Sequence, residues 1–220
     1  MKKSNKLYPE SSIELTAFIA HNYDFLMNTL SFGNYRRFIH HAIDDIGIKP
    51  TDSIIDLGCG TGRNAGLMLQ KLSDQGKLTG VDLSPIMQKQ FKARFAADKR
   101  VVFHQQRIDI PFDLGEKADI VFMSFVIHGF PQEVRNTIIE NAKNHLKPGG
   151  VFAILDFAEF DMEKMPALHR WIFKKVECPY AFDFIEKDWK KILGEHDLET
   201  VSENHYFSHY VRLIKVKKSH

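Results

Sequence analysis

The chain has little cysteine, almost no net charge and no long apolar run. Its two cysteines, Cys59 and Cys178, form no Cys-x-x-Cys pair, so we expect no disulfide framework. The 11 histidines are scattered without the spacing of metal ligands, and no metal site is expected. The formal net charge is only +2. Lysines gather near the two ends without forming a basic stripe, so no nucleic-acid partner is expected.

No segment approaches the roughly 18 consecutive apolar residues that cross a membrane. The basic N-terminus is not followed by the apolar segment of a secretion signal. We therefore expect a cytoplasmic protein with at most peripheral membrane contact, in a reducing compartment that suits unpaired thiols. With 44% hydrophobic and 26% charged residues, a chain of this length is expected to bury a full core.

The pattern of apolar residues changes near residue 50. Before it, apolar residues recur at helical spacing. Pro50 then breaks the pattern, because the residue before a proline leaves the helical region. Beyond it, short apolar runs alternate with helical patterns, which is typical of βαβ units around a parallel sheet. We predict an N-terminal helical lid over residues 1–50 and an α/β domain over residues 51–220.

The expected elements of the α/β domain follow from these runs. Strands are expected at 53–57, 78–81, 101–103, 119–125 and 151–157, and helices at 64–72, 85–95, 133–146 and 187–193. Residues 147–150, Lys-Pro-Gly-Gly, are expected to stop the third of these helices and to lead directly into the next strand. Two further strands, at 199–206 and 210–216, are joined by a short link and are expected to pair antiparallel.

Three glycines, Gly58, Gly60 and Gly62, lie between the first expected strand and the helix after it. Glycine permits positive φ and a close backbone approach at such a turn. Asp82 is expected at an exposed strand end on the same edge, where its carboxylate can accept from the two hydroxyls of a ribose. Asp56 is expected either to accept from backbone N–H groups of the turn or to contact a ligand amine. The pattern predicts a site for a ligand with a ribose and an adenine.

The same residues also admit a dinucleotide site. Residues 60–65 (GTGRNA) satisfy the G-x-G-x-x-A pattern, and Asp82 follows about 20 residues later, where such sites carry an acid. An NAD-dependent oxidoreductase is therefore an alternative on these residues alone.

Four motifs, in order along the chain, resemble those of the class I S-adenosylmethionine-dependent methyltransferases. They are residues 54–62 (IIDLGCGTG), 81–84 (VDLS), 119–124 (DIVFMS) and 145–152 (HLKPGGVF). The resemblance implies a Rossmann-like, seven-stranded, mostly parallel sheet whose last strand is antiparallel, with helices on both faces. It also implies S-adenosylmethionine as cofactor.

Within that superfamily, the N-terminal region is similar to the ubiquinone/menaquinone biosynthesis C-methyltransferases. The similarity lies in residues 23–28 (YDFLMN) and 30–33 (LSFG). The chain departs from that family after residue 33, where NYRRF replaces a stretch with His and Trp, and at 58–60, where Gly-Cys-Gly stands for Ala-Gly-Gly. The acceptor is thus open between a quinone precursor and a phospholipid amine or another small molecule.

The resemblance assigns residues to the cofactor. Thr61 is expected at the methionine end, Gln106 and Arg107 beside the adenine, and Ser124 beneath the cofactor, although Arg107 is also interpretable as a surface residue. The full expected set is Asp56, Gly58, Gly60, Thr61, Gly62, Asp82, Leu83, Gln106, Arg107 and Ser124.

Methyl transfer needs a base only where the acceptor must first lose a proton. His128, just after the fourth strand, is our candidate base, with a purely structural histidine as the alternative. Tyr23 in the lid is the second candidate, with a core aromatic as its alternative. The aromatic residues of segment 157–184 are expected either to roof an apolar acceptor or to form a packed core. A cofactor-binding module without turnover is the third possible function, and the oligomeric state is open.

Overall fold

The computed structural model describes residues 35–219, apart from the side chain of Val176. Tyr23 and the rest of residues 1–34 lie outside the described residues. The part of the expected lid that is described, α2 (Tyr35–Ile46), carries apolar residues at helical spacing. Its buried face, which includes Phe38, Ile39 and Ile43, packs into the core against the central strands.

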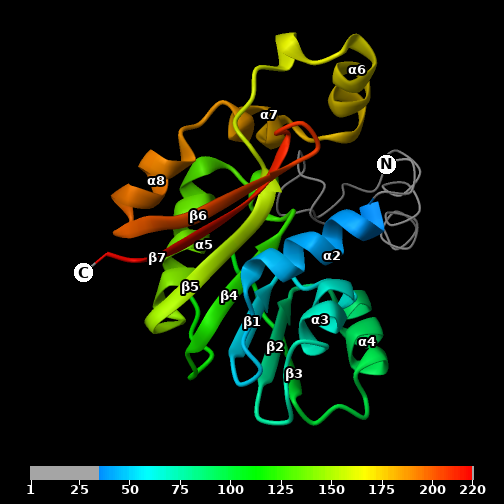
Figure 1. Ribbon diagram of the computed structural model, residues 1–220, viewed down its shortest axis with the longest axis vertical. Helices are drawn as coiled ribbons and strands as arrows, with labels where there is room; N and C mark the ends of the chain where they lie inside the picture. Colours follow the sequence, from blue (N-terminus) through cyan, green and yellow to red (C-terminus); the bar gives the residue numbers. More distant parts are fainter. Residues whose placement is uncertain (1–34, 220) are drawn as a thin grey trace, which may run out of the picture.

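A seven-stranded sheet runs in the order β3-β2-β1-β4-β5-β7-β6 through the domain (Figure 1). The neighbouring pairs from β3 to β5 are parallel, and β7 is antiparallel to both β5 and β6. The strands are β1 (Ser53–Leu57), β2 (Lys77–Asp82), β3 (Val101–Gln105), β4 (Ala118–Ser124), β5 (Leu146–Phe157), β6 (Leu198–Tyr206) and β7 (Val211–Lys218). The expected fold class is confirmed. A dinucleotide-binding sheet in its usual order has six parallel strands, so an antiparallel strand inserted between β5 and β6 distinguishes this one.

Helices cover both faces of the sheet. One face packs against α2, α3 (Arg63–Leu69) and α4 (Pro85–Arg94), and its core includes Phe91 and Phe122. The other packs against α5 (Gln132–Asn144), α7 (Pro179–Ile185) and α8 (Trp189–Glu195). Between β5 and α7 the chain forms a short 3₁₀ turn, η2 (Met162–Lys164), and α6 (Ala167–Val176). No helix within residues 35–219 is both long enough and apolar enough to cross a membrane.

The third expected helix, α5, ends at Asn144 and a strand follows directly, but the strand begins earlier than the expected residue 151 and includes residues 147–150. These residues belong to β5, which begins at Leu146 opposite Ala118 and resumes regular pairing at Val151 opposite Ile120. An irregular register at this point tolerates Pro148, which has no N–H to donate, and Gly149, whose φ is +74°. Residues 147–150 therefore form the irregular first part of β5.

Candidate functional site

The glycine turn after β1 adopts a backbone that favours glycine at three positions. The φ angles of Gly58, Gly60 and Gly62 are +76°, +52° and +77°. The backbone N–H groups of Gly58 and Cys59 donate to the carbonyl of Val81 at 2.8 and 3.1 Å, which ties the turn to β2. Leu57 and the turn thus lie at the carboxyl end of the central strands, where open α/β sheets bind ligands.

The three glycines have different neighbours. A Cβ on Gly58 would lie 2.6 Å from Val126 Cγ2, and one on Gly62 would lie 2.5 Å from the ring of Phe95. A Cβ on Gly60 would meet nothing within 4 Å among the described residues. Two of the glycines are therefore required by packing within the protein, and only Gly60 borders open space where a ligand has room.

Asp82 is not at an exposed strand end, which corrects the expectation from the sequence. Its carboxylate is half-buried and accepts from the N–H of Gly60 at 2.9 Å and from that of Ser84 at 2.8 Å. Burial raises the pKa of Asp82, and these backbone N–H bonds act against the rise. Asp82 thus shapes the turn, and its carboxylate retains lone pairs that can accept from a ligand hydroxyl.

Asp56, near the end of β1, is a buried carboxyl with an unused oxygen. It is 2% exposed, and its Oδ2 has no hydrogen-bond partner among residues 35–219. Burial, followed by the charge of Asp82, raises its pKa to about 8. A buried carboxyl beside a second carboxylate is stabilised by a nearby cation. The carboxyl groups of Asp56 and Asp82 therefore fit a ligand that has both a positive charge and ribose hydroxyls.

The other expected cofactor residues lie along the same end of the sheet. Leu83 follows Asp82 directly and is 42% exposed, and the N–H of Gln106 donates to the Asp82 carbonyl at 3.1 Å. Arg107 forms an ion pair with Asp109 at 2.6 Å, which favours its interpretation as a paired residue near the surface. Thr61 lies in the turn and Ser124 ends β4, both half-buried.

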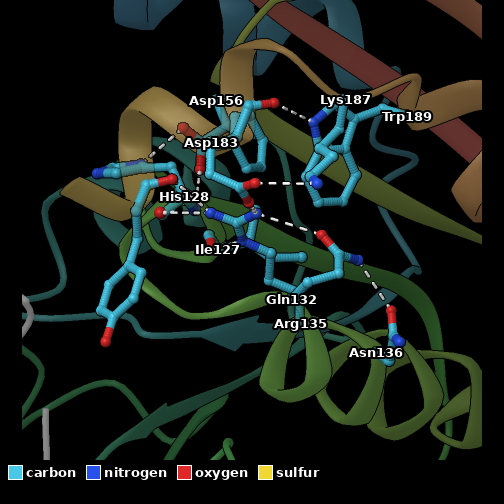
Figure 2. Close-up of polar contacts among 11 residues, drawn as sticks. Ile127, His128, Gln132, Arg135, Asn136, Asp156, Asp183, Lys187 and Trp189 are labelled. Carbon is cyan, nitrogen blue, oxygen red and sulfur yellow. Dashed lines mark hydrogen bonds and ion pairs between the residues drawn. The ribbon is translucent and has the colours of Figure 1, made fainter. Parts of the chain in front are cut away.

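His128 lies in a short 3₁₀ turn, η1 (Ile127–Gly129), two residues beyond the Val126 that touches the glycine turn. Its Nδ1 is 2.7 Å from Oδ1 of Asp156, at the end of β5, and its Nε2 is 3.6 Å from Oε2 of Glu177. Its ring also lies against that of Phe157, with the centroids 5.0 Å apart. The histidine is thus held between two carboxyl groups, and Figure 2 shows His128 together with Asp156.

The charges around His128 set its protonation. Burial by itself lowers the pKa of the imidazole, but the charge and hydrogen bond of Asp156, together with Glu177, raise it above its usual value. Burial raises the pKa of Glu177, and the charge of His128 acts against that rise. A buried imidazole with one nitrogen fixed by a carboxylate can present the other nitrogen as a base.

Arg135 on α5 fixes the turn that carries His128, and the sequence reading missed it. The guanidinium is fully buried. It donates to the carbonyls of Ile127 at 3.3 Å, His128 at 3.1 Å and Tyr180 at 2.6 Å, and pairs with Asp183 at 2.7 Å (Figure 2). Arg135 therefore joins the His128 turn to α7. An arginine inside an amphipathic helix gave no signal of this role, because exposed arginines share that pattern.

The aromatic segment after β5 is mostly packed rather than open. Phe173 and Phe184 are buried, and Phe157 and Phe182 pack against the same core. Trp171, in contrast, is 61% exposed. The packed-core interpretation holds for most of this segment. Phe157 and Phe184 also contact His128, so one side of this core borders the site.

Comparisons with known proteins agree with the fold. Residues 54–150 match a family described as methyltransferase domain. The chain is 28% identical over 204 residues to the chloroplastic 2-phytyl-1,4-beta-naphthoquinone methyltransferase of Arabidopsis thaliana, covering 86% of this chain and 77% of that protein. It is 24% identical over 173 residues to a demethylmenaquinone methyltransferase of Staphylococcus aureus, covering 78% of this chain and 70% of that one.

Solved structures with the same fold include an O-methyltransferase family protein from Burkholderia thailandensis. That protein has a TM-score of 0.67 at 20% identity over 96% of this chain and 63% of its own. A glycopeptide N-methyltransferase complexed with S-adenosyl-L-methionine has a TM-score of 0.62 at 14% identity, over 83% of this chain and 87% of its own. At these identities the structures support the fold alone.

Proposed function

We propose that this chain, a methyltransferase by its similarity to the methyltransferase-domain family and to quinone methyltransferases, uses S-adenosylmethionine to methylate a ring carbon of a hydroquinone-like acceptor with an apolar tail. The observation that carries the proposal is the His128–Asp156 pair, because His128 follows Val126, the residue that lies against Gly58 of the glycine turn. A phenolic ring becomes nucleophilic at carbon when a neighbouring hydroxyl loses its proton, so such an acceptor needs a base close to the methyl donor. Two relatives whose names specify naphthoquinone and menaquinone substrates support the same acceptor class.

The cofactor residues fit their proposed roles by their unused polar atoms. Asp82 has lone pairs left for the ribose hydroxyls, and Asp56 offers its unpartnered oxygen to the cationic methionine end. Gly60 leaves room for the backbone of the turn to approach the ligand. When bound, S-adenosylmethionine supplies a methyl group on a positively charged sulfur. Thr61, Leu83, Gln106, Arg107 and Ser124 border this space as the cofactor residues proposed from the resemblance.

His128 performs the proton step in this proposal. Asp156 holds Nδ1, so the proton sits on that nitrogen and Nε2 takes the proton of the acceptor hydroxyl. The ring carbon then forms the new C–CH₃ bond with its electron pair, while the pair of the broken S–CH₃ bond stays on sulfur. The hydrogen of the ring carbon leaves as a proton to water, and the proton held by His128 returns to the oxygen as the ring becomes aromatic again. Glu177, 3.6 Å from Nε2, lies where it can pass a proton onward. Tyr23 stays a candidate for orienting the ring.

The second candidate acceptor is a phospholipid amine, which loses its proton to water without a dedicated base. Incubation of the enzyme with methyl-labelled S-adenosylmethionine, separately with a demethylated quinol extract and with phosphatidylethanolamine, distinguishes the two. We expect label on a ring carbon of the quinol, located by fragmentation in the mass spectrometer. A reaction with excess S-adenosylhomocysteine is the control for enzyme-dependent transfer. Label on the amine with none on the quinol would overturn the proposal.

Asp56 makes cofactor binding dependent on pH. Because its folded pKa of about 8 lies above the reference value of 3.8, the folded protein holds this proton throughout that window. Protonated Asp56 contributes to the free energy of unfolding. This contribution is complete below pH 3.8 and is lost as the pH rises through about 8. A cationic ligand favours the ionised form, so its binding releases about one proton at pH 7. Cofactor affinity therefore rises with pH up to about 8.

Calorimetry in buffers of different ionisation enthalpy measures this proton. We expect Asp56→Asn to abolish most of the release, since the amide cannot ionise. S-adenosylhomocysteine, which has the amine but no sulfonium, is the matched ligand: release with both ligands assigns Asp56 to the amine, and release with S-adenosylmethionine alone assigns it to the sulfur. The same heat of binding in every buffer would contradict the role of Asp56.

A further inference from the structure

Helix α6 exposes two large apolar side chains. Leu168 is 65% exposed and Trp171 is 61% exposed, and these are the highest values among the large hydrophobic residues that the structure describes. They are three residues apart on one helix and therefore lie on the same side of it. Single exposed apolar residues are ordinary, but a tryptophan and a leucine side by side on a projecting helix form a contact surface.

Positive charge lies beside this pair. Residues 164–176 contain Lys164, Arg170, Lys174 and Lys175 and no aspartate or glutamate. Because Lys164 pairs with Asp161 and Arg170 with Glu163, the charge of this face comes from Lys174 and Lys175. Lys174 and Lys175 are exposed and follow Trp171 by three and four residues, so they extend the same side of the helix. A short helix with aromatic and aliphatic residues beside lysines has the composition of helices that lie in a membrane interface.

The opposite side of α6 holds the helix to the body of the protein. Phe173 is 9% exposed, and its ring lies 5.1 Å from that of Phe157 and 5.7 Å from that of Phe182, between centroids. Figure 1 shows α6 at the end of the molecule, beyond the sheet and the other labelled helices. The helix is thus anchored through one face while Leu168 and Trp171 face outward.

We propose that the α6 face, formed by Leu168, Trp171, Lys174 and Lys175, docks on an anionic lipid bilayer. Tryptophan and leucine enter the headgroup region, and the lysines are attracted by the negative surface. Glu177 caps α6 and lies 3.6 Å from His128 Nε2. The docking face is therefore joined through one helix to the candidate base. This inference goes beyond the proposed acceptor, because vesicle binding is measured without acceptor or turnover.

Co-sedimentation of the full chain with vesicles tests the proposal. We expect binding to phosphatidylcholine vesicles that contain phosphatidylserine and little binding to phosphatidylcholine alone. The double substitution Lys174→Glu/Lys175→Glu should weaken binding by at least about 25-fold, since each lysine near such a surface contributes about fivefold. Its control is Lys77→Glu/Lys99→Glu, which changes the net charge equally at the start of β2 and before β3. We expect this control to bind like the wild type.

Tryptophan fluorescence gives an independent measurement. The chain has two tryptophans, and Trp189 is only 2% exposed, so a blue shift on adding vesicles reports Trp171. We expect Trp171→Ala to remove the shift and to weaken vesicle binding about tenfold. Val201→Ala, at a residue 51% exposed on β6, is the matched apolar control and should change neither. Melting curves of all variants confirm that they are folded.

Three results would overturn the proposal. They are equal binding to neutral and anionic vesicles, equal loss in the two lysine double variants, and an unchanged emission spectrum of Trp171. Sedimentation velocity addresses a protein partner directly. If the wild type forms dimers that Trp171→Ala dissociates, the α6 face is a contact between copies of the chain and not a lipid surface.

Discussion

Replacing His128 by alanine should slow methyl transfer to a quinol acceptor by about 10²–10⁴-fold, the usual contribution of a positioned general base. Binding of S-adenosylmethionine should stay within about twofold of the wild type, because in our proposal His128 contacts the acceptor and not the cofactor. The measurement pairs single-turnover kinetics with calorimetry on the same preparation. A rate within about threefold of the wild type would contradict the role of His128 as base.

The size of this effect follows from where the imidazole lies. His128 is held by Asp156 at 2.7 Å and packed against Phe157 and Phe184, so its nitrogen is fixed in orientation before an acceptor binds. Water cannot replace a base of fixed position inside such a site. His128→Gln, which retains a polar group of similar reach, separates loss of the base from loss of packing. It should fold like the wild type and be nearly as slow as the alanine variant.

The pH profile provides a sharper test of the His128–Asp156 pair. Asp156 raises the pKa of His128, and a base acts only when it is unprotonated, so the rate should fall on the acid side of that raised pKa. Asp156→Asn removes the charge while retaining a hydrogen-bond acceptor. Its acid limb should therefore shift to lower pH, while the maximal rate falls because the ring is less firmly oriented. An acid limb unmoved by Asp156→Asn would mean that another group titrates there.

The conformation of the glycine turn was largely predictable from the sequence, because its determinants are local. A buried strand, glycines at three nearby positions and an acid ending the next strand are each visible as a short pattern. The pattern could not show which of the glycines are required by packing and which one borders open space. Gly58 and Gly62 are required by Val126 and Phe95, which lie far away in sequence. The burial of Asp82 likewise depends on the folded turn, so the expected exposed strand end was wrong.

The elements between β5 and α8, namely η2, α6 and α7, were not predicted from the sequence, for a physical reason. The helices are short, and α7 is held through contacts that cross the chain, among them Tyr180 to Arg135. Short helices in water are marginal, and tertiary contacts decide whether they form. Glu177 reaches His128 only through this packing, and no spacing in the sequence connects the two residues. His128 was selected as a candidate because it lies three residues beyond the predicted strand at 119–125, and its role stays a prediction.

Replacing Arg135 by alanine should lower the free energy of unfolding by about 3–5 kcal/mol, as expected when a large buried side chain with several hydrogen bonds is removed. The guanidinium donates to the carbonyls of Ile127, His128 and Tyr180, and alanine leaves these acceptors without their donor and opens a cavity. The ring of Phe184, 5.1 Å from the Arg135 guanidinium carbon, also loses its cation. The η1 turn is freed from α7, so the rate of methyl transfer should fall together with stability.

Denaturant unfolding followed by circular dichroism measures the loss, and two variants divide it into its sources. Asp183→Asn keeps Arg135 and its carbonyl bonds but removes the charge of a carboxylate that is 45% exposed. It should cost less than Arg135→Ala, because the guanidinium keeps its bonds to the three carbonyls and the amide oxygen of asparagine can still accept from it. Arg135→Lys keeps the charge without the planar fork and should fall between the other two. If Arg135→Ala were no less stable than Asp183→Asn, the ion pair and not the carbonyl bonds would hold the His128 turn, and our account of this turn would be wrong.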